Sequence, residues 1–217
     1  MTQDLSLVAW PIRTDRLTIR PATADDAEAL FAYRRQPQVH EWLSSAPADL
    51  DAFRGELEER LPRTLVLERD GAVVGDAMIR LQDAWSQHEV AAAAAGTQAE
   101  LGWVLDPEHA GQGLATEAVV ALIDTCFGPL GLRRVVADCF ADNTPSWRLM
   151  ERVGMRRENH TIRDSLHRTR GWLDGYSYAL LAEEWRSGGF HHRADSSVPS
   201  VPRGSSDPHV ARGDTDA

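Results

Sequence analysis

The sequence predicts an α/β protein with a mixed β-sheet and helices on both of its faces. Three observations indicate this class. Strand-like and helix-like segments alternate along the chain, and two of the strands each lead directly into a helix. In addition, Asp70-Gly71 separates two apolar, alternating segments, which is typical of a β-hairpin. Hairpins combined with strand–helix connections give a mixed sheet.

The N-terminal half contains strands and two capped helices. An alternating segment begins at Ile12, and the cluster Thr23-Ala24-Asp25-Asp26 can cap the helix that follows it. The elements expected here are a strand at 12–21, helices at 24–34 and 49–61, strands at 64–69 and 72–81, and an irregular insertion at 83–97, whose alanine run can form a helical turn.

The C-terminal half repeats a strand–helix pattern twice. The expected elements are a strand at 100–105, a helix at 114–127, a buried strand at 132–140, a helix at 143–153, and strands at 155–168 and 175–182. We expect the domain to span residues 10–186, preceded by a flexible leader at 1–9. From Ser187 to Ala217 the composition predicts a disordered tail.

The most informative stretch lies between Ala99 and Ala121. A strand is stopped by Asp106-Pro107, and Gly111 and Gly113 then lead straight into a helix. Such a glycine loop leaves free N–H groups at the helix N-terminus, where anions and above all phosphates bind. The dinucleotide fingerprint and the P-loop are excluded, because the third glycine and the Lys-Ser/Thr pair are missing. A tight turn without a ligand is the alternative interpretation.

Composition excludes several classes of protein. The 217 residues suffice for one domain and contain no apolar segment that could span a bilayer, and no signal peptide is recognisable. A net charge of −10 argues against nucleic acid as a partner. All 23 basic residues are arginine, so Schiff-base chemistry on lysine is excluded. Cys126 and Cys139 lie in apolar segments, which favours buried free thiols and a cytoplasmic location.

Several motifs together resemble the GCN5-related N-acetyltransferases (GNAT), in particular the ribosomal-protein N-terminal acetyltransferase branch (RimJ/RimL-type). The resemblance covers roughly residues 10–185. The segments that carry it are Glu-x-Gly-Trp at 100–103, Gly-Gln-Gly-Leu-Ala-Thr-Glu-Ala at 111–118, Asn143-x-x-Ser146, and the closing segment from Gly171-Trp172 to Glu184-Trp185. It implies a sheet of six to seven strands that splays open in a V and receives acetyl-CoA, with no metal.

The resemblance also implies which residues bind the cofactor. The phosphate loop would bind through its main chain, the strand before it would pair with the pantetheine arm, and Asn143 would add a side-chain hydrogen bond or serve only as a helix cap. The cofactor-binding residues implied are Trp103, Val104, Leu105, Gly111, Gln112, Gly113, Leu114, Ala115, Thr116, Asn143 and Ser146. The family's usual Gln or Arg at the first loop position is Ala110 here, which should weaken phosphate binding without abolishing it.

For proton transfer, Glu100 is the first candidate base, Asp164 the second and Asp174 the third, the last with a turn-holding role as its alternative. The tyrosine acid of many relatives is replaced by Met150. Ser146 is therefore the remaining hydrogen-bond donor for the leaving sulfur. Trp42 and Trp85 fall in segments that line the acceptor side in relatives and can border the substrate groove.

We therefore expect an acetyl-CoA-dependent N-acetyltransferase that works by direct attack, because the apolar strand around Cys139 argues against a covalent acetyl-enzyme. The acceptor is a protein or peptide N-terminal α-amine or a small amine, and a homodimer is common in the family. Two alternatives stay open: a non-catalytic acyl-CoA-binding module, and an acyltransferase that uses another donor such as succinyl-CoA.

Overall fold

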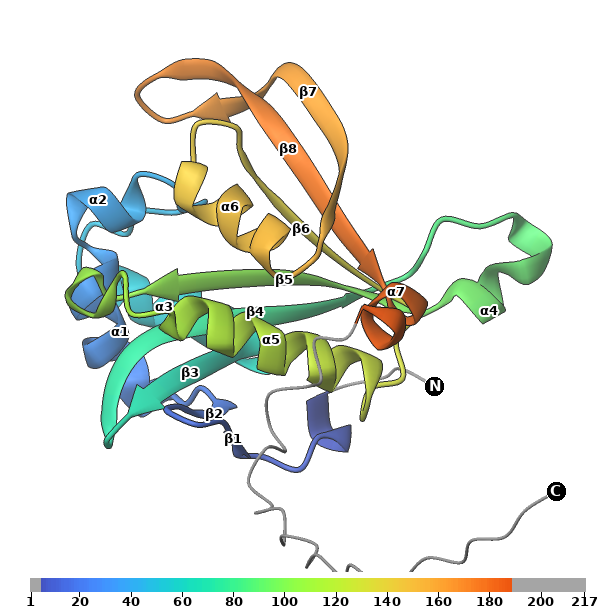
Figure 1. Ribbon diagram of the computed structural model, residues 1–217. Coiled ribbons are helices and arrows are strands. Elements are labelled where there is room, and N and C mark those ends of the chain that lie inside the picture. The colour runs from blue at the N-terminus through green and yellow to red at the C-terminus, as the bar shows by residue number, and fades with distance from the viewer. Residues whose placement is uncertain (1–4, 189–217) are drawn as a thin grey trace, which may run out of the picture.

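The computed structural model describes residues 5–188 as one β-sheet with helices on both faces (Figure 1), which confirms the expected class. Across the sheet the strand order is β1-β2-β3-β4-β5-β6-β8-β7, and β5 and β6 are parallel whereas the other neighbours are antiparallel. The strands are β1 (Ile12–Arg13), β2 (Thr18–Pro21), β3 (Thr64–Arg69), β4 (Ala72–Gln82), β5 (Gln98–Leu105), β6 (Arg134–Phe140), β7 (Arg156–His167) and β8 (Gly171–Leu181).

The helices over 50–60 and 144–152 begin where their capping residues predict, whereas the short helices at 37–40 and 182–187 were not expected from the sequence. Asp49 accepts a hydrogen bond from the Ala52 amide at 2.8 Å and so caps α3, and Asn143 caps α6. The helices are α1 (Ala27–Arg34), α2 (Pro37–His40), α3 (Leu50–Arg60), α4 (Ala91–Ala94), α5 (Leu114–Phe127), α6 (Thr144–Arg152) and α7 (Ala182–Ser187). Among residues 5–188, none of them is long and apolar enough to cross a membrane.

Two separate apolar clusters hold the helices on the sheet. The larger one packs α5, α6 and α7 against one face, with Leu122 and Ile123 fully buried. The smaller one packs α1 and α3 against the other face around Phe53 and Val66. Strand β3 contributes to both clusters, since Val66 points into one and Leu65 and Leu67 point into the other.

The N-terminal region differs from the expectation. The predicted strand at 12–21 is two short strands, because Thr14 and Leu17 exchange hydrogen bonds and close a turn between β1 and β2. The sheet therefore has eight strands rather than six or seven. Part of the expected leader is also ordered, since Leu5–Leu7 form a 3-10 helix and Val8 is buried in the larger cluster.

Two other boundaries also moved, whereas the insertion at 83–97 contains the helical turn that its alanine run predicted. Strand β8 begins at Gly171, which has a φ of +77° after a turn, and not at residue 175. The insertion at 83–97 contains a 3-10 helix at His88–Val90 followed by α4, and it projects from the body of the domain (Figure 1). Ser187 is the last residue of α7, and the expected disordered tail beyond Gly188 lies outside the described residues.

The sheet opens where its two parallel strands part. Strands β5 and β6 pair only over three positions, the last of which joins Glu100 to Val136. Beyond it, β5 continues to Leu105 beside β4, and β6 continues to Phe140 beside β8. The V-shaped opening implied by the family resemblance is thus present between these two strands (Figure 1).

Candidate active site

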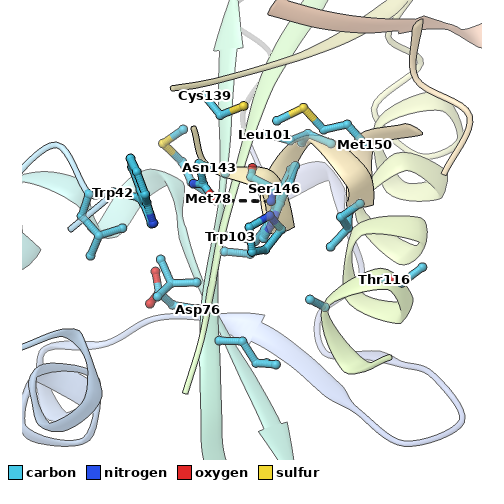
Figure 2. A pocket seen from close by; sticks show the side chains of 18 of the residues that line it. Trp42, Asp76, Met78, Leu101, Trp103, Thr116, Cys139, Asn143, Ser146 and Met150 are labelled. Carbon is cyan, nitrogen blue, oxygen red and sulfur yellow. Dashed lines mark hydrogen bonds between the residues drawn. The ribbon is translucent and has the colours of Figure 1, made fainter. Parts of the chain in front are cut away.

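A cavity of about 2460 Å³ passes through the opening between β5 and β6. Figure 2 shows that it is lined on both sides of the sheet, with Thr116 and Ser146 on the side of α5 and α6 and with Trp42 and Asp76 on the side of α1. The two sides differ in chemistry, because the first has helix N-termini and the second has carboxylates and aromatic rings.

The first side contains the predicted phosphate loop. Gly111 and Gly113 have φ angles of +74° and +79°, a conformation that only glycine adopts without strain. Gly113 is the N-cap of α5, and within the described part of the chain no side chain caps this helix end, so the first-turn amides stay directed outward. This geometry suits an anion. The predicted ligand Thr116 lies in the first turn, and its hydroxyl accepts a hydrogen bond from Arg152 Nη1 at 3.0 Å.

The start of α6 lies beside this loop. Asn143 Oδ1 accepts a hydrogen bond from the Ser146 amide at 3.4 Å, so Asn143 does cap the helix. The Ser146 side chain makes a hydrogen bond with the thiol of Cys139. Burial raises the pKa of Cys139 to about 11, although this hydrogen bond acts in the opposite direction. Cys126 is fully buried, and both cysteines are free, as expected.

The edge of β5 that faces the opening has no strand partner beyond Glu100. Trp103, Val104 and Leu105 pair with β4 on their other edge, and within residues 5–188 no strand takes the place of β6 next to them. All three residues line the cavity. An extended arm with amide groups can therefore pair with this edge as a strand would.

Glu100 faces the second side of the cavity at the point where the strands part. Its carboxylate forms an ion pair with Arg80 and accepts a hydrogen bond from Gln82 Nε2 at 3.0 Å. In the antiparallel register Glu100 is directly opposite Arg80, so these side chains share one face of the sheet. The first candidate base is thus in the cavity and held by two partners.

A buried network below Glu100 was not predicted from the sequence. Asp76 on β4 is 6% exposed, accepts hydrogen bonds from Tyr33 Oη and Arg34 Nη1, both at 2.6 Å, and lines the cavity. Burial and the Asp76 charge raise the pKa of Tyr33 well above its usual value. The network fixes α1 to β4 and keeps this wall of the cavity rigid. Its sequence signal was weak, since a single aspartate in an apolar strand does not reveal its partner.

Asp138 is a second carboxylate that sequence reasoning missed. It is exposed on β6, opposite Ser177 on β8, and it lines the cavity on the same face as Glu100. Within residues 5–188, no hydrogen bond or ion pair reaches its carboxylate. A carboxylate in the otherwise apolar segment 135–140 was the signal that could have identified it.

The second and third candidate bases have local partners. Asp164 lines the cavity and accepts hydrogen bonds from Thr161 and Ser165 at 2.5 and 2.9 Å, which lower the pKa of its carboxyl. Asp174 accepts hydrogen bonds from His160 and from the Arg163 amide at 2.9 and 3.0 Å. Asp174 therefore holds a turn, which is the alternative that the sequence left open for it.

Aromatic side chains close one end of the second side. The ring of Trp42 lies 6.0 Å from Phe140 and 5.6 Å from His167, and Trp42 and Phe140 line the cavity. Trp85 does not border it: its side chain is 93% exposed on the projecting insertion. The expectation that both tryptophans border the groove is thus wrong for Trp85, because its segment turns away from the sheet (Figure 1).

Comparison with known proteins gives one consistent family. The model of the acetyltransferase (GNAT) domain matches residues 16–156. The N-acetyltransferase YnaD of Bacillus subtilis, which is itself uncharacterised, is 29% identical and covers 80% of this chain and 98% of its own length. YdaF of the same organism, provisionally named a ribosomal N-acetyltransferase, is 28% identical over 79% of this chain and 94% of its own.

Solved structures agree with this comparison. A GNAT-family acetyltransferase from Bacillus anthracis is 28% identical, with a TM-score of 0.68 over 80% of this chain and 99% of its own. RimL, a ribosomal L7/L12 α-N-protein acetyltransferase whose structure contains coenzyme A, shares the fold at 17% identity, with a TM-score of 0.65 over 77% of this chain and 95% of its own. The chain described here therefore belongs to the GNAT acetyltransferase family, and it is an N-acetyltransferase.

Proposed function

We propose that this enzyme transfers the acetyl group of acetyl-CoA directly to a primary amine, and that donor and acceptor approach from opposite faces of the sheet. The observation that carries the proposal is the opening between β5 and β6, with two helix N-termini on one face and the carboxylates of Glu100 and Asp138 on the other. Direct transfer needs both substrates at one point of contact, and the opening supplies one.

On the donor side, three groups of residues bind the pyrophosphate, the pantetheine arm and the thioester of an acyl-CoA. The amides of residues 111–116 bind the pyrophosphate, with the α5 dipole behind them. The free edge of Trp103, Val104 and Leu105 pairs with the pantetheine amides. The side chains of Asn143 and Ser146 then lie close to the thioester end of the arm. Among residues 5–188, no group of three His, Cys, Asp or Glu side chains is placed to hold a metal ion.

The acceptor nitrogen lies between Glu100 and Asp138 in this proposal. Asp138 has no cationic partner in the described chain, so it attracts the ammonium form, and Glu100 takes the proton directly or through a water molecule. Asp164 is the further carboxylate on this side, and its lowered pKa suits a contact with a cation better than a role as base. An amine-bearing ligand therefore meets three carboxylates and the Trp42 ring.

The chemical step follows from these positions. The amine nitrogen forms a bond to the thioester carbonyl carbon, and the C–S bond breaks. The leaving thiolate accepts a hydrogen bond from Ser146 and takes up, through solvent, the proton that the nitrogen loses as the amide forms. Met150, in place of the usual tyrosine, is 1% exposed and cannot supply that proton. Cys139 does not act as a nucleophile, because its raised pKa leaves little thiolate at neutral pH.

The two acceptor classes both have parallels among proteins of the same fold. RimL is an α-N-protein acetyltransferase, and SpeG of Vibrio cholerae, with a TM-score of 0.64 at 16% identity, is a spermidine N-acetyltransferase. Ala110 and Met150 favour one further candidate, a module that binds acyl-CoA without catalysis, since each replaces a side chain that helps the reaction in relatives.

Thermal unfolding with acetyl-CoA, succinyl-CoA and CoA tests the proposal. At 100 times its dissociation constant a ligand adds about 2.7 kcal/mol of stability, which raises the midpoint plainly. Gly113→Glu should remove the shift, because it places a carboxylate at the phosphate site and strains a φ of +79°. If none of the three ligands shifts the wild-type protein, the proposal fails.

A thiol-release assay separates catalysis from binding. Free CoA should accumulate when a peptide with a free N-terminus or a diamine is added, and a module that only binds would release none. In this assay Asp138→Asn should raise KM for the amine, whereas Glu58→Gln should not. Glu58 is exposed on α3 and does not line the cavity, so it controls for the lost charge.

A further inference from the structure

The turn between β1 and β2 lies against the start of α5. Thr14 Oγ1 donates a hydrogen bond to Glu117 Oε1 at 2.6 Å, and the Arg16 amide donates to the same oxygen at 2.8 Å. The Arg16 side chain continues the contact, with Nε donating to Glu117 Oε2 at 2.6 Å. Residues about 100 positions apart in the chain are thus joined by three hydrogen bonds to one carboxylate.

From this position Arg16 also reaches the glycine loop. Its Nη1 donates to the main-chain carbonyl of Gln112 at 2.7 Å. Its Nη2 lies 3.5 Å from the point where a Cβ on Gly113 would stand. Arg69 binds the side chain of Gln112, since Arg69 Nη1 donates a hydrogen bond to Gln112 Oε1 at 2.6 Å. The predicted loop ligand Gln112 is therefore held by two arginines that sequence reasoning did not connect with it.

The hydrogen bond to the Gln112 carbonyl has a geometric consequence. That carbonyl and the Gly113 N–H belong to one planar trans peptide unit, so they point in opposite directions. Fixing the carbonyl toward Arg16 fixes the N–H away from it. Without this contact the peptide is easier to rotate, because the residue on its C-terminal side is Gly113, which is conformationally permissive.

The charge of Glu117 alone would weaken binding of a phosphate at this site. Glu117 is a carboxylate in the first turn of α5, next to the proposed phosphate site, where its charge disfavours an anion. Partial burial acts against ionisation, but the hydrogen bonds from Thr14 and Arg16 lower the pKa of Glu117, so it stays charged. Its contacts give it a different task, which is to orient Arg16.

We propose that Arg16, oriented by Glu117, is a positioning residue that sets the direction of the Gly113 N–H and so prepares the loop for the pyrophosphate of an acyl-CoA. This inference rests on the proposed function, since it concerns the same loop. The contacts of Arg16 make the β1–β2 turn part of the donor site, although that turn is remote from the loop in sequence.

Calorimetric titration with CoA tests the inference in the full-length protein. Arg16→Gln should weaken CoA binding about tenfold, the factor that about 1.4 kcal/mol produces. Arg16→Lys should lie between this variant and the wild type, because an ammonium group can serve Glu117 or Gln112 but fits both poorly. Arg54→Gln, on the exposed face of α3, removes the same charge elsewhere and should bind as the wild type does.

Glu117→Gln distinguishes positioning from simple attraction, because the two ideas predict opposite signs. Positioning predicts weaker CoA binding, since Arg16 loses its anchor, whereas attraction alone predicts tighter binding, since a negative charge is gone. Binding of pantetheine, which has no pyrophosphate, should be unchanged in both variants. An unfolded variant would bind neither CoA nor pantetheine, so this control detects loss of the fold.

Each pattern of results has one meaning. Weaker CoA binding by Arg16→Gln and Glu117→Gln, with pantetheine unaffected, supports the inference. Unchanged CoA binding by Arg16→Gln, or tighter binding by Glu117→Gln, overturns it. If the wild-type protein binds no CoA at all, the proposed function itself has failed. That result differs from failure of the inference about Arg16 and Glu117.

Discussion

Replacing Gly75 by alanine tests whether the close packing of β4 against β5 holds the part of β5 that borders the opening in place. Gly75 pairs with Leu105, and a Cβ at this position would lie 2.5 Å from the Val104 carbonyl oxygen and 3.2 Å from Leu105 Cδ1. Contacts below 3.0 Å are not tolerated, and the near atom is backbone, so β5 must shift by about 0.5 Å, the difference between 2.5 and 3.0 Å.

The size of the effect follows from two opposed terms. Forcing an extra carbon into a packed site costs about 1–3 kcal/mol. Alanine recovers about 0.4–1 kcal/mol, because it restricts the unfolded chain more than glycine does. The net loss is about 1–2 kcal/mol, and at 2–4 °C per kcal/mol for a domain of this size Tm should fall by about 2–8 °C. Since Val104 and Leu105 border the cavity, CoA binding should weaken too.

Differential scanning calorimetry without and with CoA measures the two expected effects, the fall in Tm and the weaker CoA binding. Gly55→Ala is the matched control. Gly55 lies inside α3, and among residues 5–188 nothing beyond its own stretch of helix comes within 4 Å of the position that a Cβ would take. Alanine there should therefore raise stability by about 0.5–1 kcal/mol and leave CoA binding unchanged. The reasoning is refuted if Gly75→Ala melts at or above the wild-type temperature, or if both variants bind CoA as the wild type does.

Three further predictions concern the site and the arm of the sheet beside it. Glu100→Gln should lower kcat about 100-fold or more with KM for acetyl-CoA unchanged, as measured by thiol release, since a general base is lost. Cys139→Ala should have the same kcat as the wild type in this assay, whereas loss of an essential nucleophile would abolish turnover. Hydrogen bonds, first from Arg134 and then from Arg156, lower the pKa of Glu158 to about 2, so its stabilisation is present above pH 4.5 and is lost as the pH falls toward 2. Urea unfolding of Glu158→Gln should therefore depend less on pH across this range.

Local signals allowed the donor side of the site to be predicted from sequence. The glycine loop and the helix after it occupy adjacent positions in the chain, so their geometry depends on nearby residues alone. The same holds for the Asn143 cap and for the Asp70-Gly71 turn, where both residues have positive φ angles of 53° and 81°. Each of these features needs only a few consecutive residues to form.

On the acceptor side, Glu100, Asp164 and Trp42 were expected from the sequence and line the cavity, but the rest of this side depends on tertiary contacts. Asp76 meets Tyr33 and Arg34 across more than 40 positions of sequence, and nothing in the local pattern indicates such a pair. Asp138 is a carboxylate in the otherwise apolar segment 135–140, but its lack of a partner became evident only in the folded chain. Trp85 was misplaced for a similar reason, since composition does not tell in which direction an insertion projects.

The position of the opening follows from the connection between its two strands. Because α5 links β5 to the parallel strand β6, the carboxyl ends of both strands lie at the same edge of the sheet. The chain leaves β5 toward α5 and leaves β6 toward α6, so two helix N-termini meet beside the gap. One connection thus accounts for both the gap and the amides that we propose as the phosphate site. The opposite face keeps the carboxylates of Glu100 and Asp138, which favours separate approaches for an anionic donor and a cationic acceptor.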